Sequence, residues 1–411
     1  MFTRRTNSGD IPNTDDSPNA PSSAQARATL EFNLLNYNVF QRSPGSPGGA
    51  DGYLSEEFKD QRLEELCRRL ENSPEYGASL DLICCQELFA FGQWRQEKLL
   101  ATAARMGFRS YVCSPNVAML GGWGTCLGDW ARSALAYAPN LTKWVDGGVM
   151  IVSRYPVLAS RTMEFASASG GDMFAAKGPC YLRVQHPNPS VGIIHVFSMH
   201  LQASENFRHK DGATEAEKSI RKAQVAELLA FIDECVGSDP ATETVLLAGD
   251  WNIDAHAHRS EEKSQPGGIE LASSAVKRGS RVIGSPPAEF PPSPPRGGSP
   301  EYRDLVNQLR HRMPRLRDLV LESTQVKGEG GHHPITYGAL REEDGKPFDT
   351  ILTEEPEHGC QAFVDYVFLS QPRDAPAAEC MAKVDKMQCD ETVVGSSVLS
   401  DHFAVACKLR F

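Results

Sequence analysis

The sequence lacks any stretch of apolar residues long enough to cross a bilayer, and no apolar segment follows the basic side chains near its start. The first residues instead run through Ser, Asn, Asp and Pro, which is not the pattern of a secretory signal. These absences predict a soluble, cytoplasmic protein whose contact with membranes, where there is any, is peripheral.

Positive charge is also scarce. Lys and Arg number 42 against 53 Asp and Glu, which gives a formal net charge of -11 at pH 7. An acidic surface does not attract phosphate backbones, which bind to basic patches. The composition therefore disfavours a general nuclease and leaves room only for one that uses a local basic groove.

Paired cysteine motifs are missing, although the chain contains 11 cysteines. The cysteines are scattered, none forms a CxxC pair, and Cys84 and Cys85 lie within an apolar run. This pattern predicts neither a disulfide framework nor a zinc site. We expect reduced thiols that pack as small apolar groups.

Two segments differ in composition from the rest of the chain, which at 411 residues and 40% hydrophobic content can form a sizeable core. Residues 1–28 are rich in Ser, Pro, Asn and Asp, and we expect a disordered tail because burial cannot offset the ordering entropy. Between about 256 and 300, Pro, Gly and Ser predict an inserted surface loop, since strand-like segments continue after it. Residues 29–411 then form one catalytic domain.

Short apolar runs recur along that domain. Their length and their content of Val, Ile and Phe favour buried strands over helices. The runs are 32–40, 80–85, 149–153, 192–199, 244–248, 362–369 and 403–409. Amphipathic helices are expected from Ser55 through the stripe of Leu63, Leu66 and Leu70, and again around 225–232. This layout predicts an α/β protein whose helices cover its sheets.

Several of the apolar runs are followed by a side chain that can bind metal or phosphate. Asn38 lies near the end of the run 32–40, Glu87 follows the run 80–85, and His200 follows the run 192–199. Asp250 and Asn252 follow the fifth, and strand alternation should point both the same way. Each residue alone has an ordinary explanation as a cap, a turn or a hydrogen-bonded core group. Their joint occurrence predicts that the strand ends converge on one cleft.

The last part of the chain contains FVDYVFLS, with Asp365, and LSDHFAV, with Asp401 and His402. A histidine that acts as a general base needs an acceptor for its second ring nitrogen. The apolar neighbours of Asp365 indicate burial, and a buried carboxylate without a partner is unfavourable. We therefore expect Asp365 to pair with His402.

Taken in order, these blocks resemble those of the endonuclease/exonuclease/phosphatase (DNase-I-like) superfamily. The matching blocks are LLNYNVF, CCQELF, GGVMIVSRYPV, FSMHLQ, LLAGDWNID, VDYVFLS and LSDHFAV. The resemblance covers about 31–411. It implies an α/β fold, a four-layer α/β/β/α sandwich of two packed mixed sheets, with the active site where the loops of the two sheets meet.

Within the superfamily the chain is most similar to neutral and bacterial sphingomyelinases. HVFSMHLQAS and the helix with Arg221 and Gln224 are similar to the bacterial enzymes, and GGDMFAAKGPCYLRV is similar to a segment of the neutral ones. The second similarity implies that Asp172 and Lys177 govern access to the site or its alignment. The alternative for this segment is a flexible hairpin with Lys177 in solvent.

The resemblance implies an activity and a partner. The activity is Mg²⁺-dependent hydrolysis of sphingomyelin, or of a related choline phospholipid, to ceramide and phosphocholine. The partner is a phospholipid at a membrane surface, and no nucleic acid is expected. Glu87 holds the Mg²⁺ ion with Asn38 beside it, because hard oxygen ligands suit this ion. His402, oriented by Asp365, takes a proton from the attacking water.

The remaining residues receive supporting roles. His200 and Asn252 donate hydrogen bonds to the pentacoordinate phosphorane. Asp250 either orients the attacking water or binds a second metal ion. Asp401 supports His402 or the metal shell.

Three other functions stay open. A nuclease or abasic-site endonuclease would use the same residues on a nucleic-acid backbone, and it predicts a basic groove. A phosphoinositide phosphatase is the second. A catalytically silent lipid-binding relative is the third, and it would have lost at least one site residue, whereas every expected position is filled here.

Overall fold

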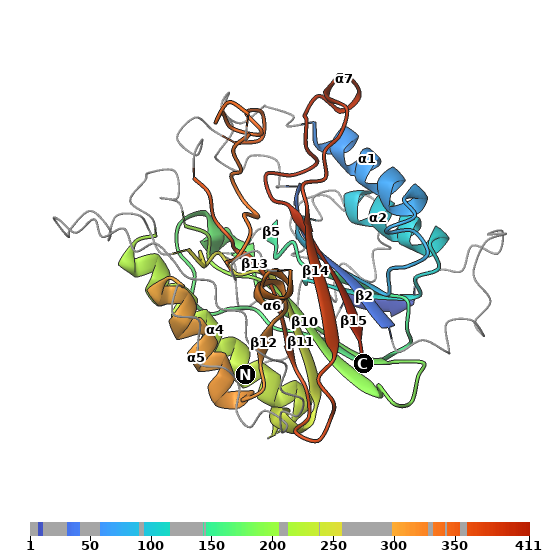
Figure 1. Ribbon diagram of the computed structural model, residues 1–411, viewed down its shortest axis with the longest axis vertical. Helices are drawn as coiled ribbons and strands as arrows, with labels where there is room; N and C mark the ends of the chain where they lie inside the picture. Colours follow the sequence, from blue (N-terminus) through green and yellow to red (C-terminus); the bar gives the residue numbers. More distant parts are fainter. Residues whose placement is uncertain are drawn as a thin grey trace, which may run out of the picture.

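Two β-sheets form the centre of the protein in the computed structural model (Figure 1). The structure describes residues 7–10, 31–41, 58–89, 94–115, 143, 145–204, 213–237, 239–256, 298–327, 332–341, 343–353 and 360–411. The expected insert lies largely outside these residues. Its two ends meet where His256 and Gly298 pair in an antiparallel bridge.

The expected disordered tail contains one short strand. Asn7–Asp10 forms β1, which pairs antiparallel with β4, Ser110–Cys113. The rest of 1–28 lies outside the described residues. Disorder was expected because the tail has few apolar side chains, but a strand at a sheet edge can be held by backbone hydrogen bonds alone. The structure thus corrects the expectation at 7–10.

The first sheet runs in the order β1-β4-β6-β3-β2-β15-β14 among the described residues. Its other strands are β2 (Glu31–Gln41), β3 (Leu82–Leu88), β6 (Met150–Ser153), β14 (Glu379–Asp385) and β15 (Ala404–Arg410). The central strand β2 is parallel to β3 and antiparallel to β15, so the sheet is mixed. Almost all of β2 is buried, because this central strand has both faces covered.

The second sheet runs in the order β12-β13-β11-β10-β9-β7 within the described part of the chain. Its strands are β7 (Val157–Thr162), β9 (Cys180–Gln185), β10 (Ile193–His200), β11 (Thr244–Asp250), β12 (Arg317–Asp318) and β13 (Asp365–Ser370). β10 and β11 are parallel, and β11 and β13 are antiparallel. A Cβ on Gly249 would lie 2.2 Å from the Met199 carbonyl oxygen, so only glycine fits before Asp250.

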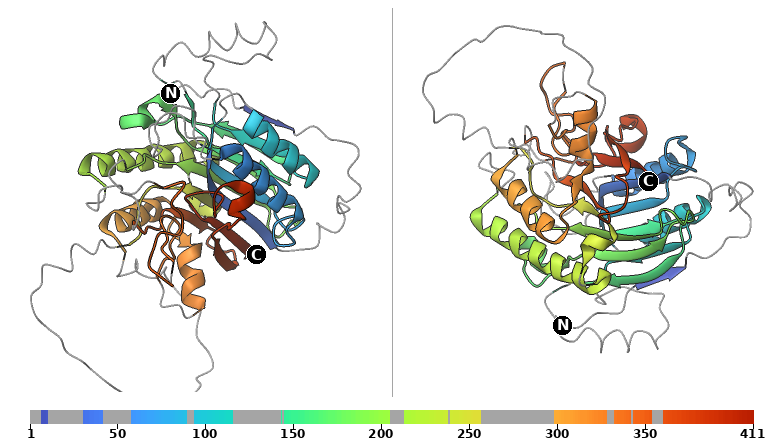
Figure 2. Two further views of the ribbon diagram at one scale, coloured as in Figure 1. Left: turned by 90° about the horizontal axis from the view of Figure 1, so that it is seen from above. Right: turned by 60° about the horizontal axis from the view of Figure 1, so that its bottom comes forward.

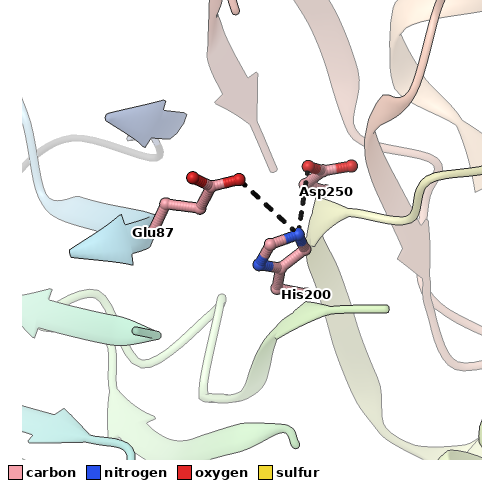
Figure 3. Close-up of side chains that lie close together, drawn as sticks. All are labelled: Glu87, His200 and Asp250. Carbon is pink, nitrogen blue, oxygen red and sulfur yellow. Dashed lines mark ion pairs between the residues drawn. The ribbon is translucent and has the colours of Figure 1, made fainter. Parts of the chain in front are cut away.

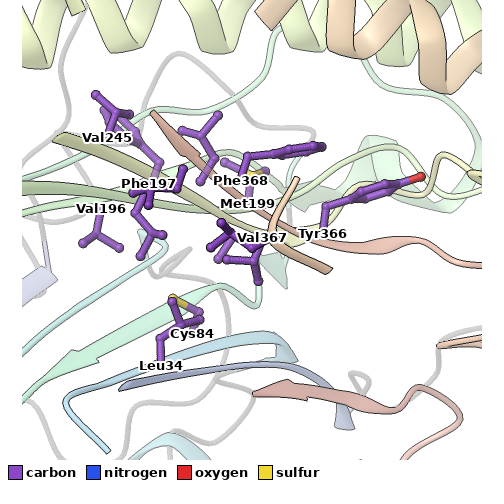
Figure 4. Close-up of a cluster of buried hydrophobic side chains, with 14 of the residues drawn as sticks. Leu34, Cys84, Val196, Phe197, Met199, Val245, Tyr366, Val367 and Phe368 are labelled. Carbon is purple, nitrogen blue, oxygen red and sulfur yellow. The ribbon is translucent and has the colours of Figure 1, made fainter. Parts of the chain in front are cut away.

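Helices cover the outer faces of the two sheets (Figures 1 and 2). The helices are α1 (Lys59–Asn72) and α2 (Trp94–Arg105) on the first sheet, and α4 (Glu215–Val236) and α5 (Pro300–Arg312) on the second. One apolar cluster lies between the first sheet and its helices. A larger apolar cluster fills the space between the two sheets and continues beneath α4 and α5. Figure 4 shows part of this cluster, with Leu34 and Cys84 on the first sheet. The four-layer α/β/β/α sandwich is therefore confirmed.

The predicted apolar runs all fall in strands, namely β2, β3, β6, β10, β11, β13 and β15. The first predicted helix is α1, which begins at Lys59, while Ser55 lies outside the described residues. The second lies within α4, which opens with a capping box between Thr214 and Glu217. None of the described helices is both long enough and apolar enough to cross a membrane.

Several shorter elements connect or flank these strands and helices. They are the parallel pair β5 (Val145–Asp146) and β8 (Ala175–Ala176), the 3-10 helices η1 (Gly170–Phe174) and η3 (Pro240–Thr242), and the helices α6 (Leu319–Val326) and α7 (Glu391–Val394). The segment from η1 through β8 carries Asp172 and leads directly to Lys177.

Candidate active site

The register of the second sheet places three predicted site residues side by side. His200 at the end of β10 lies opposite Asp250 at the end of β11, and Asp250 lies opposite Asp365 at the start of β13. Partners on neighbouring strands are within side-chain reach of each other. The pairing of these strands therefore forms a row of ionisable groups at one end of the sheet.

Asn38 joins this row to the first sheet. Its side-chain nitrogen donates to Glu87 Oε1 at 3.1 Å and to Asp250 Oδ2 at 3.0 Å. Its side-chain oxygen accepts from the backbone amide of Phe40 at 3.1 Å. The amide of Asn38 thus holds one carboxylate from each sheet. Because its oxygen already has a donor, direct metal ligation by Asn38 stays a prediction.

Glu87 stands near the end of β3 in an unusual backbone conformation. Its φ of 52° lies in the left-handed region, which is unfavourable for residues with a Cβ and often marks functional sites. Oε1 lies 3.9 Å from His200 Nε2, and Figure 3 shows the two side chains converging with Asp250. Among the described residues, Oε2 is buried without a hydrogen-bond partner. A buried carboxylate oxygen in this state is suited to receive a cation.

His200 is buried beside a cation. Its Nε2 lies 3.5 Å from Asp250 Oδ2 and 3.2 Å from Lys177 Nζ. An ammonium group can only donate, so Nε2 accepts from Lys177 and the ring is neutral. Burial, reinforced by the charge of Lys177, holds the pKa of His200 well below its usual range.

Lys177 is itself buried, with 3% of its surface exposed. Its ammonium donates to Asp172 Oδ2 at 2.8 Å and to the Leu201 carbonyl at 3.2 Å. Asp172 Oδ2 also accepts from the backbone amide of Ala203 at 2.8 Å. The alternative of a solvated Lys177 is wrong, because these acceptors draw the ammonium inward.

The predicted pairing of His402 and Asp365 is present. His402 Nδ1 lies 2.9 Å from Asp365 Oδ2, and Asp365 is fully buried. The other ring nitrogen, Nε2, lies 3.7 Å from Asp250 Oδ2. Burial lowers the pKa of His402, but the carboxylates of Asp365 and Asp250 outweigh it and hold this pKa well above its usual range.

Asp250 lies between the two histidines. Burial raises the pKa of its carboxyl, and the charge of His402 acts in the opposite direction, as does the hydrogen bond from the Asn252 amide. The net direction of the Asp250 pKa is upward, because burial is the largest effect and the Asp365 carboxylate adds a negative charge nearby. A neighbouring cation would therefore favour the charged form of this carboxyl.

The last two predicted residues lie at the margin of the cluster. Asn252 follows the end of β11 in the left-handed region, with φ of 51°, so strand alternation does not place it. A turn does so instead: its amide donates to Asp250 Oδ1 at 2.9 Å and its side chain donates to the Leu201 carbonyl at 3.2 Å. Asp401 Oδ1 accepts from the Ser400 hydroxyl at 3.2 Å.

Sequence reasoning missed Tyr337. Its ring centroid lies 5.1 Å from that of His402, and the two residues pair in an antiparallel bridge. Tyr337 belongs to a described segment, 332–341, that forms no helix or extended strand. No periodic pattern therefore marked it, and the only available signal was a Tyr flanked by Thr and Gly.

The donor set fits a divalent cation. Two groups have ligand atoms within 4.8 Å of one another: Glu87, His200 and Asp250, and then Asp250, Asp365 and His402. Glu87 Oε2 and Asp365 Oδ1 are both buried and, within the described residues, without hydrogen-bond partners. Carboxylate oxygens are the ligands that hard cations such as Mg²⁺ prefer. The arrangement can thus hold a cation at Glu87 and a base at His402.

Comparison with known proteins finds a family match and relatives named sphingomyelinase. A model of the endonuclease/exonuclease/phosphatase family matches residues 32–402. A sphingomyelinase of Dictyostelium discoideum is 26% identical over 313 residues, which cover 71% of this chain and 57% of the relative. A sphingomyelinase C of Bacillus cereus is 30% identical over 125 residues, 30% of this chain and 34% of the relative. The matches thus span about half or less of these relatives.

A solved structure shows the same fold. TDP2 of D. rerio, in complex with a single-strand DNA product, aligns with a TM-score of 0.50 at 14% identity. The alignment covers 93% of this chain and 99% of that one. At this identity the likeness concerns the fold alone.

Proposed function

The chain belongs to the endonuclease/exonuclease/phosphatase family, and from this membership we propose that it is a Mg²⁺-dependent phosphodiesterase acting on sphingomyelin or a related choline phospholipid. The products would be ceramide and phosphocholine. Support comes from the family and from relatives named sphingomyelinase. The family supports a phosphodiesterase or related hydrolase, and the substrate is the part of the proposal that a substrate panel tests.

One observation carries the proposal. Glu87, Asp250 and His402 come from separate strands and loops, yet their side chains surround one small region. Hydrolysis of a phosphodiester requires charge neutralisation at phosphorus and a base for the water, and these residues can supply both.

Glu87, with Asp250 nearby and Asn38 between them, would hold the metal ion. When bound, Mg²⁺ would neutralise charge on the phosphoryl oxygens and stabilise the leaving alkoxide. Because Glu87 Oε2 is buried with no hydrogen-bond partner in the described part of the chain, this carboxylate would be the principal ligand.

His402 would act as the base. Its Nε2 takes a proton from water while the oxygen attacks phosphorus in line with the ceramide oxygen. Nδ1 keeps its proton and donates a hydrogen bond to the Asp365 carboxylate, which stabilises the imidazolium that forms.

Asn252 would donate to a phosphoryl oxygen with the side-chain proton that the Leu201 carbonyl does not accept. Lys177, whose three protons are directed at Asp172, His200 and the Leu201 carbonyl, would act on the phosphoryl group through its charge. Since Lys177 donates to His200, the imidazole of His200 is neutral and the positive charge at this position is the ammonium. His200 Nε2 accepts a hydrogen bond from Lys177 and so orients the ammonium. This changes the donor role that the sequence led us to expect for His200. Asn252 keeps its expected role as a donor, Asp250 can orient the water, and Asp172 fixes Lys177.

The proposal is tested by a substrate panel. Purified protein with Mg²⁺ is incubated separately with sphingomyelin, phosphatidylcholine, a phosphoinositide and plasmid DNA, and the products are identified. We expect phosphocholine release from sphingomyelin, abolished in His402→Ala and retained in His311→Ala, an exposed histidine on α5. Cleavage of DNA alone would establish the nuclease function instead, and wild-type turnover by His402→Ala would reject the assigned base.

A further inference from the structure

Three fully buried polar side chains lie between the two sheets, at one end of the apolar cluster that fills this space. They are Asn36 on β2, Gln86 on β3 and Ser198 on β10. The residues two positions earlier on the same strands belong to the apolar cluster, and they are Leu34, Cys84 and Val196 (Figure 4). Side chains two positions apart lie on the same face of a strand. Asn36, Gln86 and Ser198 therefore form an inter-sheet polar layer that continues the core.

The next residues along these strands belong to the candidate site. Asn38 comes two positions after Asn36, and His200 comes two positions after Ser198. Glu87 comes directly after Gln86 and has the left-handed φ of 52°. The inter-sheet polar layer thus separates the apolar core from the groups proposed to hold a metal ion.

Gln86 joins the two sheets through hydrogen bonds. Its side-chain nitrogen donates to Asn36 Oδ1 at 3.0 Å and to Ser198 Oγ at 3.0 Å. Asn36 extends the connection, because its own side-chain nitrogen donates to the Gly249 carbonyl at 3.4 Å. Gly249 immediately precedes Asp250. The polar layer therefore ties β2 and β3 of the first sheet to β10 and β11 of the second.

Stability alone does not explain this layer. Buried polar atoms cost free energy unless they are paired, and Gln86 Oε1 is buried without a hydrogen-bond partner in the described part of the chain. Apolar side chains would avoid that cost, but apolar contacts are non-directional and do not fix the offset of one sheet against the other. Hydrogen bonds have preferred lengths and angles, and a buried network of them favours one arrangement.

The candidate site depends on that offset, because its groups come from both sheets. Glu87 belongs to the first sheet, whereas His200 and Asp250 belong to the second. Glu87 Oε1 lies 3.9 Å from His200 Nε2 across the gap between the sheets. Oxygen ligands must lie at a short, fixed distance from a bound cation, so a shift of one sheet against the other would separate Glu87 from Asp250.

We propose that Gln86 is a positioning residue, which acts through Asn36 and Ser198 to set the distance between the Glu87 carboxylate and the groups on the second sheet. The inference rests on the proposed function, in which Glu87 and Asp250 hold one metal ion. It adds to that function a residue that touches neither the metal nor the substrate.

Metal affinity without substrate provides the test. Mn²⁺ is titrated against the protein, and the free ion is followed by its electron paramagnetic resonance signal. Gln86→Met removes both donated hydrogen bonds and nearly keeps the volume, and it should raise the Kd for Mn²⁺ on the order of tenfold. Ser198→Ala removes one of the two acceptors and should raise the Kd less. This second variant keeps the test decisive if Gln86→Met folds poorly.

Gln371→Met is the matched control. Gln371 is a buried glutamine after the end of β13 that lies away from Asp365. Its side-chain nitrogen donates to the Pro376 carbonyl at 3.1 Å, and its side-chain oxygen accepts from the Ala378 amide at 2.8 Å. Gln371→Met should lower the thermal unfolding temperature and leave the Kd for Mn²⁺ unchanged. If the folded Gln86 and Ser198 variants also keep the wild-type Kd, the role of Gln86 is only structural and the proposal is overturned.

Failure of the proposed function gives a different result. Wild-type protein that binds Mn²⁺ but cleaves no phosphodiester would reject that function, and the Mn²⁺ affinities would still decide the role of Gln86. If wild-type protein binds no Mn²⁺, the metal role fails, and crystal structures of wild type and Gln86→Met decide instead. A change of more than about 0.5 Å in the separation of Glu87 from His200 would support positioning by Gln86, and an unchanged separation would overturn it.

Discussion

Replacing Asp365 with Asn isolates the contribution of one charge. The change keeps the size of a fully buried side chain whose Oδ2 lies 2.9 Å from His402 Nδ1. An amide oxygen can still accept from Nδ1, so the ring keeps its orientation. What is lost is the negative charge that stabilises the imidazolium during proton transfer.

The expected size of the effect follows from this hydrogen bond. A hydrogen bond to a charged group is worth about 1.5–3 kcal/mol, and each 1.4 kcal/mol changes a rate about tenfold. Asp365→Asn should therefore lower kcat by about 10- to 150-fold. KM should change little, because Asp365 is fully buried and would act on the substrate only through His402.

The pH dependence should change as well. In the wild-type protein burial lowers the pKa of His402, and the Asp365 and Asp250 carboxylates more than reverse this. Without the Asp365 charge the pKa of His402 falls, so the neutral, basic ring persists to lower pH. The acid limb of the kcat profile should move to lower pH.

The assay is kcat against pH for p-nitrophenyl phosphocholine, with thermal unfolding to check the fold. Asp374→Asn, at an exposed position after β13, controls for the substitution itself and should resemble wild type. An unchanged kcat with an unchanged acid limb would refute the view that Asp365 acts through His402.

Other perturbations test separate parts of the structure. Glu87→Gln should raise the Mg²⁺ concentration needed for half-maximal rate more than tenfold, measured by Mg²⁺ titration, because the buried carboxylate is the proposed principal ligand. Burial and Lys177 lower the pKa of His200, so below about pH 6.5 this histidine is protonated in the unfolded chain but stays neutral in the folded one. The free energy of unfolding should therefore fall as the pH falls below that value. His200→Gln should flatten this slope in urea unfolding. Arg62→Met should cost about 2–5 kcal/mol in urea unfolding, because the buried guanidinium donates to three backbone carbonyls that would be left without it.

The strands that sequence patterns predicted are those buried on both faces. β2 and β11 read as continuous apolar runs because a sheet or helix covers each side. β14, with the sequence ECMAKVD, was missed because it lies at a sheet edge and all but one of its side chains are exposed or half-buried.

The sequence predicted those residues of the candidate site that lie at the ends of recognisable strands. His200 and Asp250 were found because parallel strands bring their ends together. The position of Lys177 could not be predicted, because it depends on how the segment after η1 folds back on Leu201. The direction of the Asn252 side chain was predicted from strand alternation, which does not apply, because the chain leaves the strand conformation directly after Asp250.

The central claim is that residues far apart in the sequence surround one divalent cation, with His402 opposite it. Anomalous diffraction from crystals soaked in Mn²⁺ tests this directly. We predict an anomalous peak within coordination distance of the Glu87 carboxylate. Mn²⁺ bound only at sites remote from Glu87, or no bound Mn²⁺ in crystals of active protein, would contradict the account.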